Sequence, residues 1–167
     1  IGDIDAKTAQ TFVPYGLDNS SFPEDLWQWL ETTAESTGGT FLAIPHNSNI
    51  SKGVMFDMTS LRGEKIDAQY AELRRYWEPI VEITQIKGDS EAHSSLSPDD
   101  PFADFETYPF YIQSRWTEYK PQPGDYVRSA LRRGLSLEAD LGVNPYQFGV
   151  IGSTDGHTAL PSAGGGN

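Results

Sequence analysis

Three short apolar runs, each followed by polar or charged residues, constrain what this chain can fold into. Residues 40–44, 79–84 and 148–151 have the composition of buried strands, and helical patterns precede or separate them. A helix, a glycine turn and an apolar strand in that order are typical of α/β proteins. In such folds, functional side chains gather where the strands end, at their carboxyl edge. The sequence therefore predicts an α/β fold, with the candidate site just after the strands.

Three segments carry helical signals. Ser21 is the expected N-cap of a first helix, with Glu24 at capping-box spacing and Gly38-Gly39 as its end. Apolar residues recur at i, i+4, i+7 and i+11 over residues 66–77, which predicts a second, amphipathic helix. Pro123-Gly124-Asp125 opens the third. Helices thus alternate with the predicted strands.

The composition suits a single domain over residues 1–167 and narrows its partners. Hydrophobic residues make up 37% of the chain and aromatic residues 12%, enough for a packed core. The net charge of −12 disfavours nucleic acid, because phosphate binding needs clustered Lys and Arg, and the pairs Arg74-Arg75 and Arg132-Arg133 fit solvated helix faces. No apolar stretch is long enough to span a membrane. We expect neither nucleic acid nor a membrane as partner.

Histidines and a carboxylate follow two of the predicted strands. His46 comes directly after the first strand and Pro45, while Asp155 and His157 follow the last strand, two residues apart. The chain has no cysteine, so any metal must be held by His, Asp, Glu and water. Imidazole and carboxylate donors suit zinc, manganese or iron. The spacing indicates a divalent metal site, although each of these residues alone also fits an ordinary polar loop.

Three further charged residues are candidates for the same site. Glu82 lies inside an apolar strand, where alternation turns it away from Val81, so it faces either the site or water. Lys87 could hold an anionic substrate group, and Glu91 or His93 could transfer protons. An ordinary polar loop is the other interpretation of these residues. Serine-hydrolase, P-loop and dinucleotide motifs do not occur.

The strand ends resemble, in order, the later motifs of the PHP superfamily (polymerase and histidinol phosphatase). The matching stretches are 38–46, 79–83 and 152–157. A closer resemblance, over roughly residues 20 to 160, is to the PHP-like domain of unknown function 3604. It is carried by Pro23-Glu-Asp-Leu-Trp27, Pro45-His-Asn-Ser-Asn49, Lys87-Gly-Asp-Ser-Glu91 and Ser153-Thr-Asp-Gly-His157.

This resemblance implies a metal-dependent hydrolase on a distorted, TIM-like β/α barrel with mainly parallel strands. It makes His46, Asp155 and His157 metal ligands, and it places Glu82, Lys87 and Glu91 at other motif positions. We assign Glu82 to the metal, and Lys87 and Glu91 to catalysis. The opening His-x-His strand of the family has no counterpart before His46. We therefore expect the central-to-C-terminal part of a larger barrel, weakly active or inactive by itself.

The expected reaction is hydrolysis of a small anionic ester, a phosphate or, as a second option, a sulfate, at a divalent metal. The alternative is a non-catalytic α/β module that binds a carbohydrate or a protein through Trp116, Tyr119 and the acidic loop at 88–104. A homo-oligomer is also possible, because an incomplete barrel leaves strand edges that self-association would cover.

Overall fold

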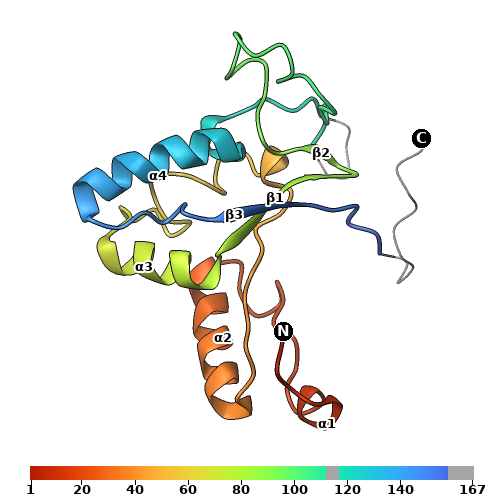
Figure 1. Ribbon diagram of the computed structural model, residues 1–167, viewed down its shortest axis with the longest axis vertical. Helices are drawn as coiled ribbons and strands as arrows, with labels where there is room; N and C mark the ends of the chain where they lie inside the picture. The colour runs from red at the N-terminus through yellow and green to blue at the C-terminus, as the bar shows by residue number, and fades with distance from the viewer. Residues whose placement is uncertain (112–116, 158–167) are drawn as a thin grey trace.

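A small three-stranded sheet, in the order β2-β1-β3, organises a mixed α/β fold (Figure 1). The computed structural model describes residues 1–111 and 117–157. Its strands are β1 (Ile80–Gln85), β2 (Gly88–Asp89) and β3 (Gly149–Gly152). β1 pairs parallel with β3 and antiparallel with β2. Two of the three predicted strands are therefore confirmed, at 80–85 and 149–152.

Helix α4 (Val127–Leu141) connects the two parallel strands. Parallel neighbours need a long crossover, and α4 supplies it between β1 and β3. The helix ends at Gly142, whose φ of 78° lies in the left-handed region that glycine adopts without steric cost. The chain then returns directly to β3, beside β1.

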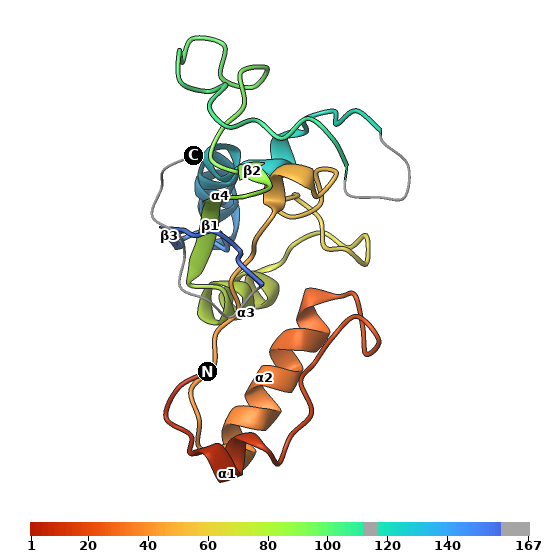
Figure 2. The same cartoon turned by 90° about the vertical axis from the view of Figure 1, so that its right-hand side faces the viewer.

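The main core joins α3 (Ala68–Trp77), α4 and β1. A second cluster joins α2 (Pro23–Thr37) to α3 through Trp27, Leu30 and Trp77. Figure 2 shows α2 and the N-terminal segment at one end of the molecule, next to α3, with the sheet and α4 toward the other. The buried members of the main core are Phe56, Ile66, Ala71, Val81, Val127, Ala130, Leu137, Val143 and Tyr146.

The three predicted helices form, but the predicted first cap is wrong. Phe22 occupies the N-cap position of α2 without a side-chain hydrogen bond, and Pro23 begins the helix. Ser20, not Ser21, accepts from the Phe22 N–H, at 3.1 Å. Proline in the first turn removes one of the donors that a cap would satisfy, so the helix starts without one. The short elements are α1 (Ala6–Ala9), η1 (Ser48–Ile50) and η2 (Pro123–Asp125).

The strand predicted at 40–44 does not form; Thr40 makes only an isolated bridge to Gly2. The chain nevertheless runs beside β1. The Ala43 N–H donates to the Trp77 carbonyl at 2.8 Å, and the Pro45 carbonyl accepts from the Glu82 N–H at 3.0 Å. These two bonds follow the pattern of a parallel ladder. The next donors of that ladder would come from positions 45 and 79, but both are proline and have no N–H. Two prolines thus reduce this strand to single contacts.

The structure shows the α/β class but not the expected TIM-like barrel. It has one parallel and one antiparallel strand pair, so the expectation of mainly parallel strands is only partly met. Every residue of β3 is exposed, including Val150 at 54%. Among residues 1–111 and 117–157, no helix is long and apolar enough to cross a membrane.

Candidate functional site

The carboxyl ends of β1 and β3 bring Lys87 and Asp155 together. Gln85, the last residue of β1, donates from Nε2 to Asp155 Oδ2 at 3.0 Å. Lys87 Nζ forms an ion pair with the same oxygen. β1 and β3 run parallel and adjacent, so residues that follow them meet at one edge of the sheet. The structure thus brings together two of the residues that the sequence analysis assigned to one site.

His157 completes this group, which we call the strand-end cluster: Asn47, Gln85, Lys87, Asp155 and His157. His157 Nε2 lies 3.1 Å from Asp155 Oδ1, and the His157 side chain is 83% exposed. Asp155 has a positive φ of 51°, a conformation that Asp tolerates better than most residues. Both carboxylate oxygens of Asp155 are therefore engaged, one by a histidine and one by a lysine and an amide.

A buried layer of amides holds the backbone of Lys87. Gln85 Oε1 accepts from the Lys87 N–H, and Gln85 Nε2 also donates to Asn47 Oδ1. Asn49 Nδ2 donates to the Lys87 carbonyl at 2.9 Å. Asn49 itself is fixed by Ser90, whose hydroxyl donates to Asn49 Oδ1 at 3.0 Å. The position of Lys87 is thus set by its main chain as well as by its ion pair.

Lys87 also sets the charge state of Asp155. The hydrogen bond from Lys87 lowers the pKa of Asp155 below its usual value of 3.8, with a smaller lowering from His157. Partial burial opposes the shift without reversing it. Asp155 is therefore a stable carboxylate at neutral pH, as a cation ligand or a partner for an ammonium group must be.

Glu82 lies on β1 and is buried, at 7% exposure. Its Oε1 has no hydrogen-bond partner among residues 1–111 and 117–157. Buried carboxylate oxygens are costly to leave unpaired, so an orphaned one is a candidate for binding a ligand. Its neighbour across the sheet is Ile151, so the strands themselves offer it no polar partner.

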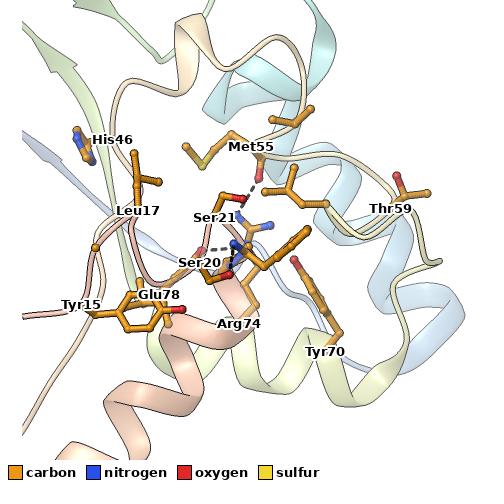
Figure 3. A pocket seen from close by; sticks show the side chains of 16 residues that line it. Tyr15, Leu17, Ser20, Ser21, His46, Met55, Thr59, Tyr70, Arg74 and Glu78 are labelled. Carbon is orange, nitrogen blue, oxygen red and sulfur yellow. Dashed lines mark hydrogen bonds and ion pairs between the residues drawn. The ribbon is translucent and has the colours of Figure 1, made fainter.

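No hydrogen bond joins the His46 side chain to the strand-end cluster within residues 1–111 and 117–157, although His46 directly precedes Asn47 of that cluster. His46 is exposed and lines a cavity together with Arg74 and Glu78 (Figure 3). Within the described part of the chain, no group of three or more His, Cys, Asp or Glu residues is arranged to hold a metal. Of the four predicted ligands, the structure joins only Asp155 and His157 by a direct contact.

Glu91 and His93 make other interactions. Glu91 Oε1 accepts from Arg128 Nη2 at 2.9 Å, so the predicted catalytic carboxylate is paired with a residue of α4. His93 accepts or donates at Nδ1 to the Ser95 hydroxyl, 2.8 Å away, and packs against the Tyr126 ring. Burial lowers the pKa of His93. No hydrogen bond or ion pair joins either side chain to the strand-end cluster among the described residues.

Sequence reasoning missed two polar residues that the structure uses. Gln85 forms hydrogen bonds with Asp155, Asn47 and Lys87. Its place as a polar residue at the end of an apolar strand is the sequence feature that could have indicated this role. Arg74, expected on a solvated face, is 5% exposed and pairs with Glu78. Tyr119, expected on a contact surface, is buried at 6%, and Trp116 lies outside the described residues. Tyr119 is therefore too buried to contribute to the contact surface of the alternative carbohydrate- or protein-binding module.

The whole chain, residues 1–167, matches the family model described as a protein of unknown function (DUF3604). The chain belongs to this family. Its membership confirms the closer of the two resemblances found in the sequence and extends it to the full length of the chain. No curated protein and no solved structure matches this DUF3604 chain. The relationship to PHP metallohydrolases therefore stays a prediction.

Proposed function

We propose that this DUF3604 chain is part of a metal-dependent hydrolase of phosphate, or sulfate, esters, on an incomplete PHP-like barrel. One observation carries the proposal: Lys87, Asp155 and His157 meet at the carboxyl ends of two parallel strands joined by a helix. That edge is where α/β proteins assemble their sites. A cationic group for the ester and two metal donors then share one place.

The donor types of the cluster fit a divalent metal, but their number fits only part of a site. Asp155 and His157 are suitable ligands for zinc, manganese or iron. Catalytic zinc sites use about three protein ligands. Glu82, with its orphaned buried oxygen, and His46 are the further donors that the proposal assigns. We therefore expect weak metal binding and little activity from the chain by itself.

A divalent ion in such a site supplies a bound water of lowered pKa and neutralises charge on the ester oxygens. The residues of the chain supply binding and orientation. Lys87 presents an ammonium group, and its position is set by Gln85 and Asn49. An anionic ester oxygen can accept from it in place of Asp155. His157 is exposed enough to reach solvent or substrate.

Metal content, measured by mass spectrometry on tag-free protein, tests the assignment. We expect zinc, manganese or iron to bind weakly when the protein is brought to equilibrium with the metal by dialysis, and binding to be reduced in Asp155→Asn and in His157→Gln. His93→Gln is the matched control, because His93 contacts Ser95 and Tyr126 instead. Metal bound equally by all variants, or taken up by none, contradicts the proposed site. Positive samples are then assayed with p-nitrophenyl phosphate and p-nitrophenyl sulfate.

A further inference from the structure

A cavity of about 490 Å³ lies between the N-terminal segment, α3 and the loop that follows His46 (Figure 3). Its volume falls within the range of small-molecule sites, which are mostly apolar with a few placed polar groups. His46 stands at its edge. Its apolar walls include Leu17, Phe22, Leu26, Val54, Met55 and Leu61.

Arg74 is a buried, charged group of this cavity with donors to spare. A guanidinium carries five N–H groups. Arg74 Nε donates to Glu78 Oε2 at 2.9 Å, and Nη2 donates to the Met55 carbonyl at 2.8 Å. Its Nη1 has no hydrogen-bond partner within residues 1–111 and 117–157. The side chain is nine-tenths buried and lines the cavity, so its free donors are available to a bound molecule.

Glu78, in contrast, has no free oxygen in its contacts with the protein. Its Oε2 accepts from Arg74, and its Oε1 accepts from Trp27 Nε1 at 3.0 Å. The ion pair is neutral as a whole. A carboxylate ligand placed against Arg74 would also meet the nearby Glu78 charge at low dielectric, whereas a neutral carbonyl oxygen would not.

We propose that this cavity binds a small apolar molecule that carries one neutral hydrogen-bond acceptor, such as a ketone or ester carbonyl. The acceptor takes the free N–H groups of Arg74, and the apolar body lies against Leu26, Val54 and Met55. None of the five residues of the strand-end cluster lines this cavity, and the inference does not rest on the proposed hydrolase function.

Three probes with the same ring system test the acceptor. 2-Acetonaphthone offers a neutral carbonyl, 2-isopropenylnaphthalene replaces that oxygen with CH₂, and 2-naphthoate offers a carboxylate. Binding to the full chain is followed by amide shifts in NMR titrations. We expect 2-acetonaphthone to shift the amides of Ser20, Met55 and Thr59, and to bind about tenfold more tightly than 2-isopropenylnaphthalene. 2-Naphthoate is expected to bind more weakly than the ketone.

Variants locate the binding without breaking the buried ion pair. Val54→Trp fills the cavity from a wall that is 44% exposed, and it should weaken 2-acetonaphthone binding at least tenfold. Leu135→Trp is the control, because Leu135 on α4 is 65% exposed and does not line the cavity. Equal affinity for the ketone and its CH₂ analogue, shifts that map elsewhere, or undiminished binding to Val54→Trp would each overturn the proposal.

Discussion

Replacing Glu78 with glutamine should destabilise the fold more than any surface change, because it leaves Arg74 as an unpaired buried charge. Arg74 and Glu78 are 5% and 6% exposed, and their side chains form an i, i+4 ion pair at 2.9 Å. Removing one partner of a buried pair costs about 3–5 kcal/mol, whereas exposed pairs are worth less than about 1 kcal/mol. The buried figure applies here, since the two side chains are only 6% and 7% exposed.

The geometry makes glutamine a sharper probe than a full truncation. Glu78→Gln keeps one acceptor oxygen but turns an NH₂ group toward either Arg74 Nε or Trp27 Nε1. A donor then faces a donor, and the guanidinium charge has no counter-charge. The cation also lies 4.9 Å from the Tyr146 ring centroid, a contact that softens the loss without replacing a carboxylate.

Urea unfolding measures the effect. With an m-value of about 2 kcal/mol/M, the predicted loss lowers the midpoint by about 2 M. Arg75→Met, on the exposed face of the same helix, should change stability by less than about 0.5 kcal/mol.

The double variant Arg74→Met/Glu78→Gln separates charge from packing. It removes the stranded cation while keeping an oxygen for Trp27 Nε1, so it should recover most of the stability lost in Glu78→Gln. A midpoint for Glu78→Gln close to that of Arg75→Met would refute the reasoning. So would a double variant as unstable as the single one, since the loss would then not come from an unpaired charge.

Three further outcomes follow from single contacts. The lowered pKa of Asp155 means that its contact with Lys87 adds stability above pH 3.8 and loses it as the pH falls below that value, so Lys87→Met should flatten the acid limb of a pH–stability curve. Val81→Ala should cost about 2 kcal/mol in urea unfolding and Val150→Ala, its exposed partner in the sheet, less than about 0.5 kcal/mol. Gly142→Ala should cost about 1–2 kcal/mol by the same measure, because alanine is strained at a φ of 78°.

Elements with a strong local pattern could be predicted from the sequence. The helix over 66–77 begins at Ala68 in the structure, capped by Asp67, and ends at the predicted Trp77. The failure of the strand at 40–44 could not be predicted in this way. Its ladder depends on N–H donors that Pro45 lacks and that Pro79, far along the chain, also lacks. Apolar composition indicates that a segment is partly buried, whereas pairing requires N–H groups on both sides.

The candidate site was predictable where it depended on topology. Lys87 and Asp155 follow parallel neighbouring strands, so their meeting requires only the correct strand pairing. His46 follows the segment in which pairing fails, and it stands at the edge of the cavity that Arg74 also lines. The burial of Arg74 could not be inferred from sequence, because Arg and Glu at i, i+4 occur equally on solvated helices.

Within the strand-end cluster, the positive charge of Lys87 neutralises the negative charge of Asp155. This ion pair affects how a metal ion and an anionic ester could bind at the same cluster. The ammonium of Lys87 takes the Asp155 oxygen that a divalent cation would need, and Gln85 and His157 occupy the remaining positions. A cation bound at Asp155 Oδ2 would therefore compete with Lys87 for that oxygen. Because the backbone of Lys87 is fixed by Gln85 and Asn49, its freed ammonium would stay beside the site, where an anionic ester oxygen could accept from it. Metal binding and substrate binding at this cluster should accordingly be coupled through Lys87, with metal affinity rising in Lys87→Met while affinity for the anionic ester falls.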